Sequence, residues 1–374
     1  MADLSIYVHI PYCIKRCGYC DFNTYTPSEL QDGATLEIVS GDYIDAVLKE
    51  LENAPVDKAP TIFFGGGTPS LLPPKDLGRV ITAIKERNGL TQDCEITLEA
   101  NPDSVTPEKL QGFIDAGFNR ISFGMQSAKP HVLAALDRTH NPENVKKAVD
   151  AARAVGFSSI SVDLIYGTPG ESLEDWRETL TAALELDIDH ISAYALIVEE
   201  GTKLAARIKR GELTMPDDDL MADMYLLLDF MCEQAGFTWY ELSNWSKAGH
   251  ECKHNVAYWK SLNWWGLGPG AHSHIDKKRF WNLKHPNTYK TKLFAGDTVI
   301  LGSEDLSDEQ LHDEALLLAI RMREGVPKNL LSDVQIAKFD EYVASEDLIQ
   351  EQDAFVLTTK GRLLADLIVR EALS

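Results

Sequence analysis

Apolar and polar residues follow two alternating periodicities along the first 243 residues of the chain. Short apolar runs rich in β-branched residues predict six strands, at Ser5–Ile10, Thr61–Phe64, Glu95–Glu99, Arg120–Met125, Ser159–Ile165 and His190–Ile197. Stretches with helical spacing of apolar residues predict the helices Asp42–Asn53, Lys75–Arg87, Pro107–Ala116, Glu143–Val155, Leu173–Leu186 and Asp217–Gln234. Strands that alternate with amphipathic helices indicate parallel βαβ units, so the sequence predicts an α/β fold.

A faint internal repeat supports this prediction. The copies are Ala116-Gly-Phe-Asn-Arg-Ile-Ser, Val155-Gly-Phe-Ser-Ser-Ile-Ser and Ala235-Gly-Phe-Thr-Trp-Tyr-Glu, each typical of a helix end followed by a strand. Glycine suits the left-handed position just past a helix C-terminus. Six βα units favour an incomplete, (βα)6 barrel similar to a TIM barrel over the closed eightfold one, and an open doubly wound sheet is the alternative.

The pattern changes after residue 243. Six of the seven tryptophans lie between Trp239 and Trp281, in a glycine-punctuated segment with neither a clean helical nor a clean strand period. A final unit follows, with helices at Leu306–Arg323 and Asp333–Ala344, a hairpin at Leu348–Leu357 and a terminal helix from Lys360; this order resembles a small helical, winged-helix-like domain. We therefore expect three parts, namely a partial barrel (1–243), a Trp-rich segment (244–300) and a C-terminal domain (301–374).

Composition excludes several classes of function. The chain has 36 basic and 58 acidic side chains, for a formal net charge of −22, and such a chain repels phosphate backbones. We therefore expect no nucleic-acid partner, and we expect the C-terminal domain to pack against the barrel. No apolar run approaches the ~20 residues of a membrane span, and no targeting sequence is evident, so we expect a cytoplasmic protein without a transmembrane segment.

Three of the six cysteines lie within eight residues, in the run Cys13-Ile-Lys-Arg-Cys17-Gly-Tyr-Cys20 after the first predicted strand. A cubane iron–sulfur cluster normally takes four thiolate ligands. Three thiolates can bind it and leave one iron open for another ligand. A structural zinc site would need four closed ligands, and the nearby His9 lies inside a predicted strand. A disulfide framework would need a cysteine-dense secreted chain. For the remaining cysteines we expect buried packing: Cys94, Cys232 and Cys252.

Glycyl and polar residues stand at the ends of the predicted strands, where parallel barrels carry their chemistry. The second strand ends in Gly65-Gly66-Gly67-Thr68-Pro69-Ser70, where missing side chains let the backbone approach a ligand. No Gly-Lys-Ser/Thr follows, so this turn is not a phosphate P-loop. The third strand ends in Glu99, the fourth in Gln126 and the fifth in the run Asp163-Leu-Ile-Tyr-Gly-Thr-Pro-Gly, and the sixth runs through Tyr194-Ala195. We expect these residues to form one site beside the cysteine loop.

The motifs together resemble the oxygen-independent coproporphyrinogen III oxidase family of the radical S-adenosylmethionine (radical SAM) superfamily, almost end to end. The resemblance rests on Tyr7-Val-His-Ile-Pro, the three cysteines, Phe-Gly-Gly-Gly-Thr-Pro-Ser, Glu99-Ala-Asn-Pro, Phe-Gly-Met-Gln126-Ser, Arg138 and Asp163-Leu-Ile-Tyr-Gly. It implies a partial radical SAM barrel that carries a [4Fe-4S] cluster on Cys13, Cys17 and Cys20. In this superfamily the open iron chelates S-adenosylmethionine, which is then cleaved reductively.

The resemblance also implies the residues of the S-adenosylmethionine pocket. They are Tyr7, Tyr19, Gly66, Gly67, Thr68, Glu99, Gln126, Arg138, Asp163 and Ala195. Their chemistry suits the ligand, because Glu99 can anchor the methionyl amine and Asp163 can accept a hydroxyl or an amine. Arg138 would supply a charged donor for a carboxylate.

Two features favour the non-oxidase branch of this family, the HemW-type heme chaperones. The oxidases carry a further cysteine two residues past the triplet, where this chain has Phe22. The first predicted strand begins at Ser5, so we expect no room for the N-terminal arm of the oxidases. In addition, the run His254-Asn-Val-Ala-Tyr258-Trp259 resembles the His-Asn-x-x-Tyr-Trp heme-binding motif of that branch.

The residues of this motif suit heme for physical reasons as well. Imidazole is a common proximal ligand of heme iron, and Tyr258 follows His254 on the same face of a helix. Trp264 and Trp265 would add a flat apolar surface. The residues alone leave two alternatives open. In one, His254 caps a helix and the tryptophans close the barrel bottom; in the other, the iron ligand is His272 or His274.

Three functions follow from the sequence. The leading hypothesis is a heme chaperone that carries a [4Fe-4S] cluster and S-adenosylmethionine, binds heme through His254, Tyr258 and Trp259, and transfers the heme to an acceptor protein, whether soluble or membrane-associated. The second is a radical SAM enzyme of porphyrin biosynthesis such as an oxygen-independent oxidase. The third is a heme sensor or storage protein with a relic cluster. No catalytic residue is assigned, and enzymatic activity is left open.

Overall fold

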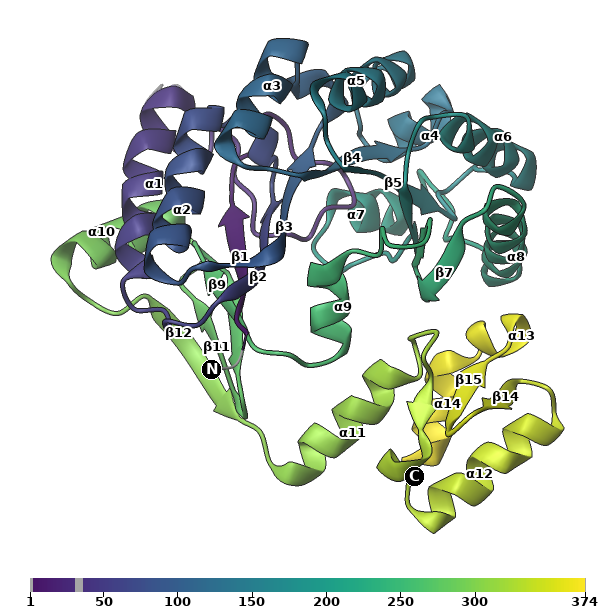
Figure 1. Cartoon of the computed structure of the whole chain (residues 1–374). Helices are drawn as coiled ribbons and strands as arrows, with labels where there is room; N and C mark the ends of the chain where they lie inside the picture. Colours follow the sequence, from purple (N-terminus) through teal and green to yellow (C-terminus); the bar gives the residue numbers. More distant parts are fainter. Residues whose placement is uncertain (1–2, 31–35, 374) are drawn as a thin grey trace.

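The computed structural model describes residues 3–30 and 36–373, and its centre is a sheet of six parallel strands (Figure 1). These strands are β1 (Ser5–Ile10), β2 (Ala59–Gly66), β3 (Leu90–Ala100), β4 (Arg120–Gln126), β5 (Ser159–Tyr166) and β6 (His190–Ala195). Each strand pairs in parallel with the next one in sequence. The prediction of six parallel βα units is confirmed; β2 to β5 extend beyond their predicted bounds, whereas β6 ends at Ala195 rather than at Ile197.

Helices cover the outer face of this sheet (Figure 1). The six expected helices are present as α1 (Leu36–Leu51), α2 (Pro74–Arg87), α3 (Pro107–Ala116), α5 (Pro142–Val155), α6 (Leu173–Leu184) and α8 (Asp218–Gln234). Two short helices, α4 (Pro130–Ala135) and α7 (Lys203–Lys209), were not predicted, because a single buried face over six or seven residues leaves little periodicity. Gly117 and Gly156 take the left-handed conformation after α3 and α5, as the internal repeat predicts.

The Trp-rich segment is more regular than its sequence indicates. Its strands are β8 (Asn244–Ser246), β9 (Trp264–Leu267), β10 (His272–Ile275) and β11 (Lys278–Asn282), and its helices are α9 (Lys253–Trp259) and α10 (Pro286–Ala295). The expectation of a segment without clean helices or strands is therefore wrong, because strands of three to five residues are too short to show a period.

These short strands extend the sheet at both edges. Beyond β6 lie β8 and then β7 (Thr238–Glu241), and beyond β1 lie β9, β10, β11 and β12 (Ile300–Asp305), which gives 12 strands in all among the described residues. The order runs from β12 at one edge to β7 at the other, so the barrel stays incomplete. The sheet also crosses the expected boundaries after residues 243 and 300, and the three-part division stays a prediction.

The C-terminal unit, drawn in yellow-green and yellow in Figure 1, has a separate cluster of buried hydrophobic residues. Its elements are α11 (Asp308–Ala319), β13 (Val326–Pro327), α12 (Asp333–Ala344), β14 (Leu348–Glu351), β15 (Ala354–Leu357), α13 (Thr359–Arg362) and α14 (Ala365–Ala372). The first helix is shorter than predicted at both ends: Ser307 caps its N-terminus, and the helix ends at Ala319 rather than at Arg323. The buried Arg362 forms an ion pair with Asp229 of α8, at 2.5 Å, and so fastens this unit to the barrel.

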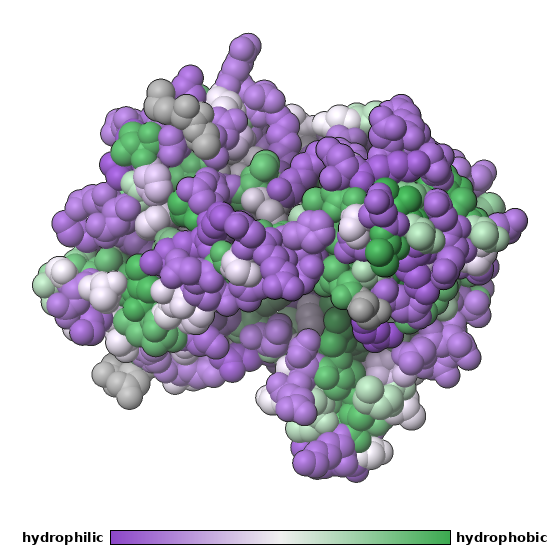
Figure 2. Space-filling model, turned by 90° about the horizontal axis from the view of Figure 1, so that it is seen from below, coloured by the Kyte–Doolittle hydropathy of each residue, from purple (hydrophilic) through white to green (hydrophobic). Residues whose placement is uncertain are grey.

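The surface is dominated by hydrophilic side chains. Figure 2 shows one face on which patches of hydrophobic residues lie between hydrophilic ones. Among the residues the structure describes, no helix combines the length and the apolar character that a bilayer crossing would need.

Glu50 of α1 joins the barrel to the Trp-rich segment from a buried position. Its carboxyl accepts hydrogen bonds from Gly268 N, at 2.8 Å, from Asn282 Nδ2 and from the hydroxyl of Tyr289. Burial raises the pKa of Glu50 from 4.5 to about 7. The folded protein therefore holds this proton more tightly than the unfolded chain does.

This linkage predicts that Glu50 makes stability depend on pH. Its contribution is complete below pH 4.5 and is lost as the pH rises through 7, because unfolding then releases a proton. In urea titrations, the wild type should lose roughly 2 kcal/mol more unfolding free energy than Glu50→Gln between pH 5 and 8.5. Every other titrating group is common to both proteins, so the difference isolates Glu50. Parallel curves for the two proteins would contradict the prediction.

Candidate functional site

Polar side chains line the interior of the partial barrel. At alternate positions of four neighbouring strands, the following residues face a common cavity: Thr97, Glu99, Arg120, Ser122, Ser161, Asp163, His190 and Ser192. The cavity has a volume of about 840 Å³ and extends from the cysteine loop to α9. Most of these residues were not predicted as site residues. The signal was present in the sequence, because polar residues at every second position of a buried strand indicate a polar interior.

The three predicted cluster cysteines face the same cavity. Cys13, Cys17 and Cys20 lie on the loop after β1 and line the cavity together with Thr68 and Arg138. The Thr68 hydroxyl lies 3.6 Å from Cys13 Sγ, and Arg138 Nη1 lies 3.4 Å from Cys17 Sγ. Both groups can donate to a sulfur that carries negative charge.

The thiols do not surround a single point. Burial raises the pKa of the Cys13 thiol to about 11, so it is protonated until iron displaces the proton. Among the described residues, no three His, Cys, Asp or Glu side chains are arranged to hold a single metal ion. This arrangement is compatible with a cubane, because a cubane binds each thiolate at a different iron.

The backbone of the glycine turn after β2 forms another wall of the cavity. Gly66 has φ +106°, and a Cβ there would lie 2.4 Å from the ring of His9. A Cβ on Gly67 would lie 2.6 Å from the carbonyl oxygen of Tyr12. No other residue fits at either position without displacing its neighbours. The backbone N–H of Gly66 donates to Glu99 Oε2 at 3.1 Å, so the turn and the end of β3 are joined.

Two half-buried carboxyl groups face the cavity from neighbouring parts of the sheet. Burial, and then the charge of Asp163, raise the pKa of Glu99 from 4.5 to about 8. Burial also raises the pKa of Asp163, against the opposing effect of the Ser122 hydroxyl, which donates to Asp163 Oδ1 at 2.8 Å. Such groups gain a strong partner when a ligand brings an amine or a hydroxyl. Asp163 lies within β5 rather than at its end, because the strand continues to Tyr166.

Gln126 and Arg138 complete the wall beside Cys17. Gln126 ends β4 in the left-handed conformation, with φ 62°, next to a β-bulge. Such strain in a residue other than glycine is concentrated at functional sites. Arg138 donates through Nη2 to the carbonyl oxygen of Gly124 at 2.8 Å, and this bond holds the guanidinium against the strand.

All ten residues predicted for the S-adenosylmethionine pocket line this one cavity. They are Tyr7, Tyr19, Gly66, Gly67, Thr68, Glu99, Gln126, Arg138, Asp163 and Ala195. Cavities that hold small ligands commonly have 300–1,000 Å³ and a few convergent polar groups. Three thiols, two carboxyl groups and a guanidinium around a cavity of about 840 Å³ therefore fit a cluster and S-adenosylmethionine.

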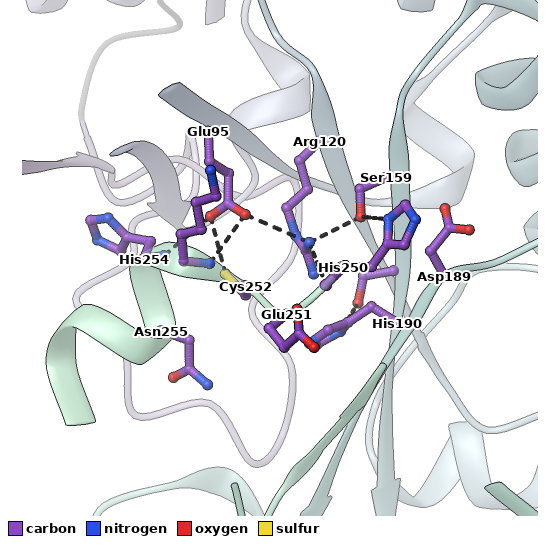
Figure 3. A network of polar contacts seen from close by, with 12 residues as sticks. Glu95, Arg120, Ser159, Asp189, His190, His250, Glu251, Cys252, His254 and Asn255 are labelled. Carbon is purple, nitrogen blue, oxygen red and sulfur yellow. Dashed lines mark hydrogen bonds and ion pairs between the residues drawn. The ribbon is translucent and has the colours of Figure 1, made fainter. Parts of the chain in front are cut away.

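Helix α9 lies at the other end of the cavity, and a buried polar network holds it in place (Figure 3). Glu95 of β3 accepts from the backbone N–H groups of Lys253 and His254, both at 3.1 Å, and so caps the helix. Arg120, with 3% of its surface exposed, lies 3.6 Å from Glu95 and donates to Ser159 Oγ at 2.9 Å.

The same network explains Cys252, for which we expected buried packing. Cys252 is buried, lines the cavity and lies 3.5 Å from Glu95 Oε1 through its sulfur. Cys94 and Cys232 are buried away from the cavity. The network joins residues from four distant parts of the sequence, so sequence reasoning missed it.

The predicted heme residues divide between the inside and the outside of the barrel. His254 is 1% exposed, its Nδ1 lies 2.7 Å from Thr61 Oγ1, and its Nε2 lies 3.0 Å from the hydroxyl of Tyr258. Tyr258 faces the cavity, whereas Trp259 does not line it and packs beneath Arg321, at 5.7 Å from ring centre to guanidinium carbon. Iron could reach His254 Nε2 if Tyr258 moved away.

A side pocket of about 380 Å³ adjoins the main cavity on the β1–β9 side. Trp264 and His272 line it, together with Tyr258. Trp265 packs against Phe280 instead, with ring centres 5.0 Å apart. His274 is buried beside Trp264, with ring centres 4.8 Å apart, and neither of its ring nitrogens has a hydrogen bond.

Comparison with known proteins agrees with this geometry. Residues 7–183 match the model of the Radical SAM superfamily. The heme chaperone HemW of Mycobacterium tuberculosis (strain CDC 1551 / Oshkosh) is 46% identical over 375 residues, which cover 99% of this chain and 94% of the relative. HemW of Synechocystis sp. (strain ATCC 27184 / PCC 6803 / Kazusa) is 36% identical over 326 residues, covering 86% of this chain and 79% of the relative.

Among solved structures, coproporphyrinogen III oxidase (HemN) from Escherichia coli superimposes with a TM-score of 0.84, at 21% identity and with 100% of this chain and 90% of that chain covered. This likeness shows a shared fold. The partial barrel and its cysteine-lined cavity define a radical SAM protein. At 46% identity over nearly the whole of both chains, the chain belongs to the HemW family.

Proposed function

We propose that this chain is a cytoplasmic heme chaperone, which binds heme and passes it to an acceptor protein. The observation that carries the proposal is the place of the motif His254–Trp259. Helix α9 bears this motif and closes the same cavity whose mouth bears the cluster cysteines. HemW relatives that match nearly the full length of the chain support the same function.

The proposed cofactors are a [4Fe-4S] cluster on Cys13, Cys17 and Cys20 and S-adenosylmethionine in the main cavity. When bound, they would supply electron transfer and reductive cleavage of a carbon–sulfur bond. Glu99 and Asp163 would accept hydrogen bonds from N–H and O–H groups of the ligand, since both carboxyl groups face the cavity. Arg138 would hold a carboxylate and neutralise Cys17.

The proposed heme site is the aromatic region around α9. Tyr258 contributes a face to both the main cavity and the side pocket, and Trp264 stands next to it with ring centres 4.8 Å apart. In this proposal, His254 shapes the site with Tyr258, Trp259 anchors helix α9 from outside the cavity through its contact with Arg321, and the candidate iron ligands remain His254, His272 and His274. The acceptor protein is proposed without an assignment to the cytosol or to a membrane.

Phe22 distinguishes this proposal from the oxidase alternative. It stands at the position where the resembling oxidases carry a further cysteine, and it is 63% exposed at the mouth of the cavity. An apolar, unreactive side chain at this position cannot do the chemistry of a thiol. It can contact the apolar edge of a porphyrin.

We therefore predict that the protein does not oxidise coproporphyrinogen III. Anaerobically reconstituted protein with reductant and S-adenosylmethionine should form no protoporphyrinogen beyond one equivalent per chain, as measured by chromatography of the porphyrins. The Escherichia coli oxidase HemN, assayed in parallel, is the positive control. Multiple turnovers by this chain would overturn the proposed function and establish the oxidase alternative.

A further inference from the structure

The side pocket next to β9 combines an aromatic wall with an accessible imidazole. Its floor is formed by Tyr258 and Trp264, and His272 stands at its side. The ring of His272 stacks on Trp281, with ring centres 5.7 Å apart and planes inclined by 24°. Stacking of this kind fixes the plane of the imidazole without using its nitrogens.

Accessibility separates the three candidate histidines. Both ring nitrogens of His254 are engaged, by Thr61 and Tyr258, and its side chain is buried. His274 is also buried, and neither of its ring nitrogens is reached by solvent. His272 is exposed, and within residues 3–30 and 36–373 no hydrogen bond involves its ring nitrogens. It can therefore bind iron without breaking an existing contact.

The charges around His272 suit a ligand with carboxylates. Lys284 and Arg279 bring positive charge near its imidazole, and Glu304, which forms an ion pair with Arg279, brings the opposing negative charge. Lys284 is exposed, and no carboxylate in the described part of the chain forms an ion pair with it. Arg279, by contrast, is paired with Glu314. Lys284 is thus free to pair with a propionate.

The cluster loop covers the opposite side of the pocket. Asn23 Nδ2 donates to the carbonyl oxygens of Pro269 and Lys284, at 2.9 and 2.8 Å, and so ties this loop to the segment that bears His272. The neighbouring Phe22 lines both the side pocket and the main cavity. Because the two spaces share walls, a flat macrocycle is not confined to the 380 Å³ of the side pocket.

We propose that His272 is the axial ligand of the heme iron, with the macrocycle between Trp264 and Phe22 and a propionate at Lys284. This inference rests on the proposed function and names the ligand that the motif alone leaves open. His254 then acts as a positioning residue, because its Nε2 holds the hydroxyl of Tyr258 at the floor of the pocket.

The test uses the full chain titrated with heme and followed by absorbance and resonance Raman spectroscopy. His272→Ala should lose the iron–imidazole signature and bind at least about tenfold more weakly, and added imidazole should restore the signature. Lys284→Glu should weaken binding without changing the signature. His254→Ala should weaken binding but keep an imidazole-ligated spectrum, and His131→Ala, on the distant α4, should match the wild type.

The outcomes separate this inference from the proposed function. Wild-type spectrum and affinity in His272→Ala, with the imidazole signature lost in His254→Ala, would overturn the assignment and leave the chaperone function standing. A wild-type protein that binds no heme would overturn both. His272 is exposed and its ring makes no hydrogen bond, so His272→Ala should lose only the stacking on Trp281 and unfold close to the wild-type temperature, and this measurement confirms that any loss of ligation is local.

Discussion

Replacing Cys17 by serine is expected to abolish the iron–sulfur cluster. With three thiolates, one iron of a cubane already lacks a protein ligand. Loss of a further thiolate leaves two irons without a protein ligand. Cys17 is also the thiol whose sulfur accepts from the guanidinium of Arg138, which stabilises the thiolate, whereas a serine hydroxyl stays protonated and cannot replace it as an iron ligand. Iron bound after anaerobic reconstitution should fall from about four atoms per chain to near zero.

Iron and sulfide analysis together with EPR spectroscopy measures this loss. The reconstituted wild type should show a cluster signal that shifts when S-adenosylmethionine is added, whereas Cys17→Ser should show neither the signal nor the shift. Cys94→Ser is the matched control, because Cys94 is buried on β3 and does not face the cavity. A stable four-iron cluster in Cys17→Ser would refute the assignment of the ligands.

The six central strands could be predicted because each is a short segment rich in buried apolar residues that alternates along the chain with an amphipathic helix. The strands at the sheet edges could not, because β7 to β11 have only three to five residues each and their pairing depends on distant partners. For example, β9 pairs with β1 although more than 250 residues separate them, with Trp265 opposite Ile6. Local periodicity carries no information about such a contact.

The residues at the mouth of the cavity could also be predicted from the sequence. In a parallel sheet the strands all end on one side, so Glu99 and Gln126 necessarily meet near the glycine turn. The floor of the cavity was not predictable, because Glu95, Arg120 and Cys252 come together only once α9 folds under the sheet.

The heme motif shows what sequence resemblance leaves undecided. Its spacing places His254 and Tyr258 together, as a helix requires, and the two do share a hydrogen bond. It does not reveal that Thr61 and Tyr258 occupy both nitrogens of the imidazole. The exposed His272 lies outside the motif. Only the folded structure shows that it lines the side pocket and stacks on Trp281.

Heme is expected to bind at one site per chain, and to bind whether or not the cluster is present. Tyr258 and the side pocket lie on the floor and flank of the barrel, whereas the cluster thiols lie on the loop at its mouth. The Cys17→Ser protein provides a chain without a cluster in which the aromatic residues and all histidines are unchanged. A porphyrin held by imidazole and aromatic side chains should therefore still bind to it.

The most direct test of the heme-chaperone function is a heme titration of the purified full chain, followed at the Soret band and compared between wild type and Cys17→Ser. We predict a saturable Soret shift with about one heme per chain in both proteins. The bound heme should then pass to an apo-heme protein without release of free heme. A folded wild-type protein that gives no saturable shift would contradict the central claim, and loss of binding in Cys17→Ser alone would mean that the cluster thiols hold the iron.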